Sequence, residues 1–134
     1  MLSHGNSKLK GLGRRLNRRV VAFDLPAGHT CPAANLCHSE VNTIRGKRTI
    51  TDHGQFRCYA VKAEVQYPAV YKLRRRNFNA TKKENFAAKL TAEILKSKAD
   101  IVRIHSSGDF YSWEYFQTWY KIAKDNPGII FFGY

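Results

Sequence analysis

Three short apolar runs, rich in β-branched and aromatic residues, are spread along the chain. They cover residues 19–25, 100–105 and 129–132, and the first is stopped by Pro26 and Gly28. Runs of this length that end at turn-forming residues are typical of buried strands. The pattern therefore predicts three strands that lie far apart in the sequence.

The segments between these runs carry apolar residues at helical spacing. From 58 to 78 the pattern is interrupted by Pro68, which predicts one kinked helix or two short ones. Thr81 and Glu84 have the spacing of a capping box, so we expect a helix that begins after Thr81. Its apolar face comprises Phe86, Ala87, Leu90, Ile94 and Leu95. Ser112 is placed to cap a further helix over 113–124.

The order of these elements predicts the fold class. Strands that alternate with helices form parallel sheets with right-handed crossovers, so we expect an α/β fold with a small, mostly parallel sheet. Residues 1–19 contain three glycines and six basic residues and are expected to form a flexible basic arm, whereas 20–134 form one domain. The stretch 29–57 reads as a long irregular loop, and such loops are uncommon unless something binds or organises them.

Composition narrows the class of protein. A chain of 134 residues is near the usual size of one domain, and 43% hydrophobic with 13% aromatic residues is typical of a globular fold. No segment approaches the roughly 18 apolar residues of a membrane span, and the first 19 residues lack the apolar core of a secretory signal. We therefore expect a cytoplasmic protein without a membrane partner, in the host cytoplasm if a phage encodes it.

The three cysteines are the strongest chemical signal. Cys31, Cys37 and Cys58 are an odd number in a chain without an export signal, which favours metal ligation or reactive thiols over disulfides. Zinc would need a fourth ligand, and the candidates are His29, His38 and His53. An iron–sulfur cluster can be held by three thiolates with one iron left open. The spacing alone leaves both metals open.

A second candidate group follows the second predicted strand. Sites in parallel α/β folds form beyond the carboxyl ends of the strands, and both the cysteine loop and the segment 105–109 fall there. His105, Ser107 and Asp109 are therefore candidates for proton transfer or for binding a substrate. The alternative is an ordinary turn in which Asp109 caps a helix and His105 bonds a buried backbone group.

The charge of the chain indicates which class of partner it could bind. With 23 Lys and Arg against 10 Asp and Glu, the formal net charge is +13. Basic clusters at 8–19, 45–48, 72–76 and 82–83 make an anionic partner, such as nucleic acid bound through the arm, a reasonable expectation. No zinc-finger, helix-turn-helix or RNA-recognition signature accompanies them, so the signal is electrostatic.

Four sequence segments together resemble one family. They are Leu25-Pro26-Ala27-Gly28-His29-Thr30-Cys31-Pro32, Cys58-Tyr59-Ala60, Arg103-Ile104-His105-Ser106-Ser107-Gly108-Asp109-Phe110 and Phe131-Phe132-Gly133-Tyr134. In this order, over about residues 20 to 134, the chain resembles the gene product 88 family of phages and bacteria. That family is in turn similar to the radical S-adenosylmethionine enzymes.

The resemblance implies a cluster site. Cys31, Cys37 and Cys58 match the cluster cysteines, and Gly108 and Asp109 stand where radical S-adenosylmethionine proteins bind the amino group of that cofactor. The spacings of five and twenty residues differ from the usual Cys-x3-Cys-x2-Cys, so a three-iron cluster is an alternative to a four-iron cluster.

The same resemblance bears on architecture and activity. Radical S-adenosylmethionine barrels have about six β/α units, whereas this chain has three strands, so we expect a partial, half TIM-like barrel. A second copy could cover the open sheet edge. The activity implied is radical chemistry or another redox function, and the alternative is a basic nucleic-acid-binding protein with a structural Cys/His zinc site.

Overall fold

The computed structural model describes residues 1–37, 39–51 and 58–134. In chain order the elements are α1 (Ser7–Leu16), β1 (Val20–Phe23), β2 (Val41–Ile44), β3 (Lys47–Ile50), α2 (Tyr59–Gln66), α3 (Pro68–Thr81), α4 (Phe86–Ser97), β4 (Ile101–Ile104), α5 (Trp113–Asp125) and β5 (Ile130–Phe132).

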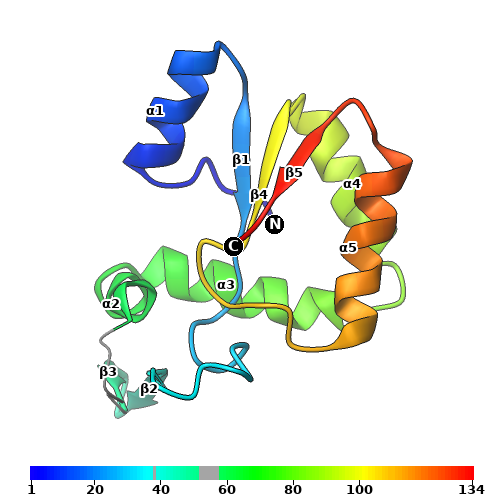
Figure 1. Ribbon diagram of the computed structural model, residues 1–134. Coiled ribbons are helices and arrows are strands. Elements are labelled where there is room, and N and C mark those ends of the chain that lie inside the picture. Colours follow the sequence, from blue (N-terminus) through cyan, green and yellow to red (C-terminus); the bar gives the residue numbers. More distant parts are fainter. Residues whose placement is uncertain (38, 52–57) are drawn as a thin grey trace.

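The central sheet confirms the predicted fold class. Its strand order is β1-β4-β5, both pairs are parallel, and β2 and β3 form a separate antiparallel pair (Figure 1). The three strands form an open sheet and no closed barrel within the described residues. β5 is an outer strand of this sheet, and pairing of a second copy along it stays a prediction.

The two faces of the sheet bury different residues because side chains alternate along a strand. Val21 and Phe23 of β1 face the main core, which α4 and α5 cover. Val20 and Ala22 face the other way and pack against Leu9 of α1. Figure 1 shows α1 on one side of the sheet and α4 with α5 on the other. The main core is completed by Leu90, Ile94, Val102, Ile104, Trp119 and Ile122.

The N-terminal segment is part of this packing. Residues 1–19, for which the sequence predicts a flexible arm, contain α1, and Ser3 forms an antiparallel bridge with Ala22 of β1. Asn6 caps the helix by accepting a hydrogen bond from the backbone of Leu9, whose side chain is buried. The buried Leu9 and the partly buried Leu12 therefore hold this basic helix against the sheet.

Two local predictions are corrected by the structure. α4 begins at Phe86, whereas Thr81 is the last residue of α3 and donates its hydroxyl to the carbonyl of Phe78 at 2.7 Å. Thr81 thus serves the end of one helix instead of capping the next. Leu95 is also exposed, although Phe86, Leu90 and Ile94 are buried as predicted.

Part of the expected irregular loop forms a hairpin. β2 and β3 are joined by a tight turn in which Arg45 has φ 49° and Gly46 has φ 78°. Left-handed residues at both centres are typical of the two-residue turns that suit antiparallel strands. The split of the 58–78 helix at Pro68 is confirmed, since α2 ends at Gln66 and Pro68 opens α3.

Truncation of one core leucine tests the packing of α4. Leu90 is fully buried, and Leu90→Ala is expected to lower the free energy of unfolding by about 2 to 5 kcal/mol because it removes apolar contact and leaves a cavity. Denaturant titration measures this. Leu95→Ala, on the same helix but 56% exposed, is the control and should cost less than about 1 kcal/mol. Equal losses in the two variants would contradict the packing described.

Candidate metal centre

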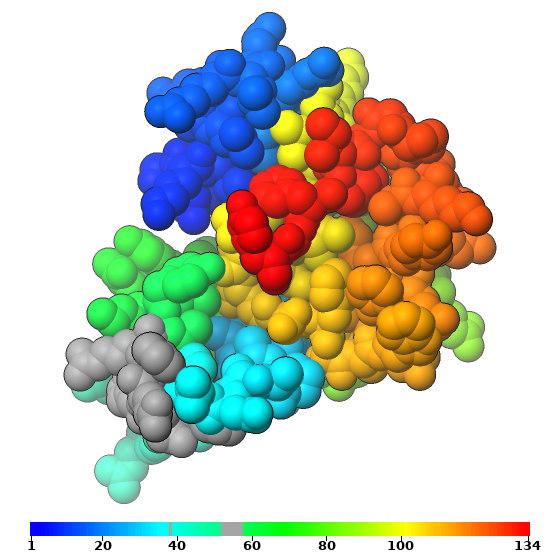
Figure 2. Space-filling model, in the orientation of Figure 1, coloured from blue at the N-terminus to red at the C-terminus, as the bar shows by residue number. Residues whose placement is uncertain are grey.

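Two loops meet at the carboxyl ends of β1 and β4. The backbone N–H of Leu25 donates to the carbonyl of Ser107 at 2.9 Å, and that of Asp109 donates to the carbonyl of Thr30 at 3.0 Å. The backbone of Ser106 also donates to a carboxylate oxygen of Asp24 at 2.6 Å. The loop after β4 is therefore hydrogen-bonded at several points to the loop that leads to the cysteines. Figure 2 shows these two segments side by side on the surface.

Two glycines allow this close approach. Gly108 has φ +77°, and a Cβ atom there would lie 2.5 Å from the Cβ of Leu25 and 2.5 Å from the hydroxyl of Thr30. Gly28 has φ +73°, and a Cβ atom would lie 2.3 Å from the carbonyl oxygen of Ser39. Both positions need glycine for conformation and for space.

The cysteines lie around this junction. Cys31 and Cys37 belong to consecutive turns, in which the backbone of Cys31 donates to Gly28 at 3.0 Å and that of Cys37 to Ala34 at 3.0 Å. Cys58 precedes the first residue of α2 and packs against the small apolar cluster that contains Ala27. All three thiols are free and half-buried.

The pKa of Cys31 depends on its burial and on the other candidate ligands. Burial raises the pKa of the Cys31 thiol, and the negative charges of Asp109, Cys58 and Cys37 raise it further, against a lowering by a backbone hydrogen bond at Gly28. The structure thus brings Asp109 and the three predicted cysteine ligands into one region. In its metal-free form, Cys31 keeps its proton at neutral pH.

The donor set is spread out. In the described ranges, no three histidine, cysteine or acidic side chains are close enough to surround one metal ion. Among the histidines considered as a fourth ligand, His29 places its ring edge-on to Phe78 at a centroid distance of 4.9 Å. His38 and His53 lie outside the described residues.

His105 lies apart from the thiols, on the side of the main core. It is 8% exposed, and its ring packs on Phe110, Tyr115 and Trp119. Its Nε2 is 2.9 Å from the hydroxyl of Tyr115. Burial lowers the pKa of the imidazole to about 4, so the ring is neutral at physiological pH. The backbone at His105 has φ 63°, which turns the chain out of β4.

The other two candidates occupy different environments. Ser107 is buried, and within the described part of the chain its hydroxyl has no hydrogen-bond partner. Asp109 is exposed, with one carboxylate oxygen accepting from the backbone of Phe110 at 2.7 Å. Asp109 is therefore free to bind a ligand beside the thiols, while Ser107 fixes the loop through its carbonyl.

A buried ion pair supports the cysteine loop and was missed from the sequence. Glu64 is fully buried, and its Oε1 accepts from the backbone of Ala27 at 2.8 Å and from the guanidinium of Arg74 at 3.0 Å. Arg74 also donates to the carbonyl of Ala60 at 2.9 Å. One sequence feature could have indicated this ion pair: Glu64 lies on the same helical face as the apolar Ala60 and Val61. A charged side chain buried on such a face requires a partner of opposite charge.

The comparison with protein families identifies the family of the whole chain. The family model described as gene product 88 matches residues 1–134, and the chain belongs to this phage protein family. The match includes residues 1–19, whereas the resemblance noted in the sequence covers about residues 20 to 134. No curated protein and no solved structure matches the chain. None of the helices in the described ranges is long and apolar enough to cross a membrane.

Neutral burial of His105 predicts an acid-sensitive fold. The unfolded chain protonates this ring near its ordinary pKa of 6.5, whereas the folded ring stays neutral down to about 4. The stability from this group is therefore present above pH 6.5 and is lost as the pH falls, by about 2 kcal/mol between pH 7 and pH 5. Denaturant titration at both values measures the loss. His105→Asn, which tolerates the left-handed backbone, should remove most of this loss; an unchanged pH dependence would contradict the assignment.

Removal of the Glu64 charge tests the support of the cysteine loop. Glu64→Gln leaves the buried guanidinium of Arg74 without a counter-charge, so the free energy of unfolding should fall by about 3 to 5 kcal/mol. Chemical denaturation measures it, with exposed Glu84→Gln as the matched control. Similar values for the two variants would show that the ion pair does not hold this region.

Proposed function

We propose that the protein binds an iron–sulfur cluster through Cys31, Cys37 and Cys58. The observation that carries the proposal is the gathering of three free, half-buried thiols and the carboxylate of Asp109 at the junction of two bonded loops. Sites in α/β folds form at this edge of the sheet.

The charges of this group favour a metal. Burial raises the pKa of the Cys31 thiol, and Asp109, Cys58 and Cys37 raise it further, so a thiolate at Cys31 is unfavourable without a cation. A bound cationic centre would offset this cost, because thiolates become stable ligands once their protons are released.

The separation of the donors favours a cluster over zinc. With Zn–S bonds of about 2.3 Å, tetrahedral thiolates on one zinc ion stand only about 4 Å apart. In the described residues, no group of three His, Cys, Asp or Glu side chains is placed to hold one metal ion. A cluster suits a wider set, since each cysteine binds a different iron.

Asp109 supplies the second feature of the proposed site. A four-iron cluster held by three cysteines leaves one iron free to bind another ligand. The bound cluster would supply one-electron redox chemistry. In this proposal the exposed carboxylate of Asp109 binds an amino group on that ligand. S-adenosylmethionine, whose amino and carboxyl groups can bind an iron, is the ligand we propose. Reversible electron transfer is the alternative use of the same site.

Single cysteine substitutions test the proposal. Cys31→Ala, Cys37→Ala and Cys58→Ala, purified without oxygen, are each expected to lose most of the broad absorption near about 400 nm that the parent protein should show. Thr51→Ala is the control, because Thr51 is exposed on the segment between Cys37 and Cys58. Circular dichroism verifies folding of every variant.

Two results would contradict this assignment. One is full absorption in all three cysteine variants. The other is a colourless parent protein with one zinc ion per chain, which would instead favour the nucleic-acid-binding alternative with a structural Cys/His site.

A further inference from the structure

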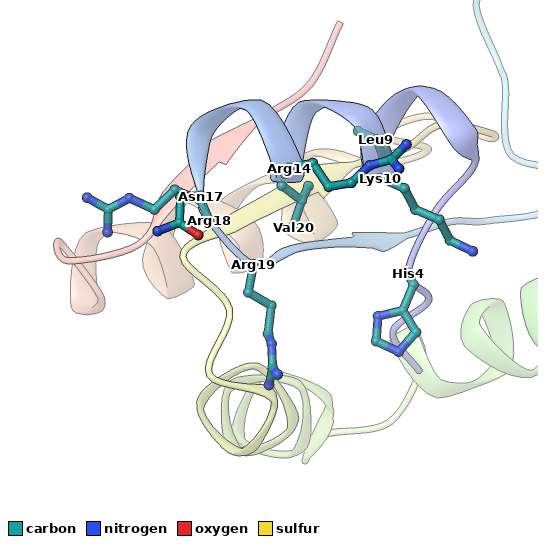
Figure 3. A pocket seen from close by; sticks show the side chains of 9 residues that line it. His4, Leu9, Lys10, Arg14, Asn17, Arg18, Arg19 and Val20 are labelled. Atoms are coloured by element: carbon teal, nitrogen blue, oxygen red, sulfur yellow. The ribbon is translucent and has the colours of Figure 1, made fainter.

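A groove of about 680 Å³ lies between α1 and the start of β1 (Figure 3). Leu9 and Val20 are the buried apolar residues in its lining. The groove is at the amino end of β1, whereas the thiols lie beyond its carboxyl end. The strand has four residues, so about 13 Å of strand separates the two places.

One face of α1 forms a wall of the groove. Residues 10, 13, 14 and 17 all line it, and this spacing places them on one side of a helix. Gly13 lets α1 approach closely, since a Cβ atom there would lie 2.8 Å from the carbonyl oxygen of Arg18. The helix ends with Asn17 in the left-handed conformation, and the backbone of Arg18 donates to Gly13 at 3.0 Å. Backbone contacts at the end of α1 therefore fix the position of this helix beside the groove.

The lining is basic. It contains Lys10, Arg14, Arg18 and Arg19, and no acidic residue. Asp100, outside the lining, pairs with Arg18 at 3.1 Å, and the guanidinium of Arg19 donates to the carbonyl of Ser97 at 2.6 Å. Figure 3 shows Arg19 pointing away from α1, whereas Lys10 and Arg14 extend from the helix itself. Within the described residues neither Lys10 nor Arg14 forms an ion pair.

A second basic row lies along the same helix. Lys8 and Arg15, together with Gly11 and Leu12, line a separate hollow of about 370 Å³ on the opposite side of the helix. α1 therefore carries four cations in ten residues and no acidic residue. Such a concentration favours an anion that contacts several cations at once.

The length of the groove and the charges around it favour a polyanion over a single small anion as its ligand. The groove is lined along α1 from Leu9 and Lys10 to Asn17, and Arg18 at its far end is already paired with Asp100. A single small anion would contact only part of this length. A polyanion contacts cations along the whole groove and gains from counterion release. Apart from the imidazole of His4, the lining has no aromatic ring on which a base could stack.

We propose that this groove binds the phosphodiester backbone of nucleic acid, with Lys10 and Arg14 as its main contacts. Recognition is through phosphate and independent of base sequence. The proposal is separate from the cluster site, because it uses a different end of β1.

Paired substitutions test it. Fluorescence anisotropy is measured with labelled duplex DNA and single-stranded RNA of about 20 nucleotides, at salt concentrations from about 50 to 200 mM. The double variant Lys10→Gln with Arg14→Gln should bind at least about tenfold more weakly. Its slope of log affinity against log salt should be smaller by about 1.4 to 1.8. Lys121→Gln with Lys124→Gln on α5 has the same change in charge at exposed positions and should lose less than about threefold.

Three results would overturn the proposal: equal losses in the two double variants, no binding of either oligonucleotide by the parent protein at low salt, or binding of phosphatidylserine vesicles without binding of oligonucleotides. The absorption of the parent protein and of both double variants is recorded in the same preparations. A change in affinity with unchanged absorption separates this groove from the cluster site.

Discussion

The parallel pairing of β1 with β4 positions the other features of the candidate site. Its register matches Val20 with Ile101 and Phe23 with Ile104, and it continues beyond the strands through the bonds from Leu25 to Ser107 and from Asp109 to Thr30. A shift by one residue in either strand would exchange the side chains that face the main core with those that face α1. It would also separate Asp109 from Cys31. The same hydrogen bonds that complete the sheet therefore assemble the group of thiols and carboxylate.

The chemistry of the molecule is divided between the two ends of β1. Acidic and thiol groups gather at the carboxyl end, where Gly28 and Gly108 permit close packing of the loops. Cations gather at the amino end, along α1 and the residues that follow it. The basic cluster of residues 8–19 and the cysteines thus lie at opposite ends of β1, and the family match extends over both.

The sequence predicts the strands and most helices because their apolar patterns coincide with burial. The pattern of Val20 to Phe23 is unambiguous, since all four residues are buried on one face or the other. α1 escapes prediction because only Leu9 is fully buried, too little to produce a periodic signal. The hairpin escapes because Arg45 takes a left-handed conformation that Asn or Asp usually occupies. Thr81 misleads because its hydroxyl has a nearer acceptor in its own helix.

For the candidate site, the sequence indicates the neighbouring loops and the residue types but not the partner of each side chain. The position of His105 illustrates the difference. An imidazole after a strand suits proton transfer, yet a left-handed backbone directs this one among aromatic rings, where it is neutral. Glu64 shows the reverse case, since a residue without an evident chemical motif holds the cysteine loop through Ala27.

The content of iron, acid-labile sulfide and zinc in protein purified without oxygen tests the central claim most directly. The account predicts iron and sulfide in about equal amounts, at about three to four of each per chain, with little zinc. One zinc per chain without sulfide, or no metal in a folded protein, would contradict it.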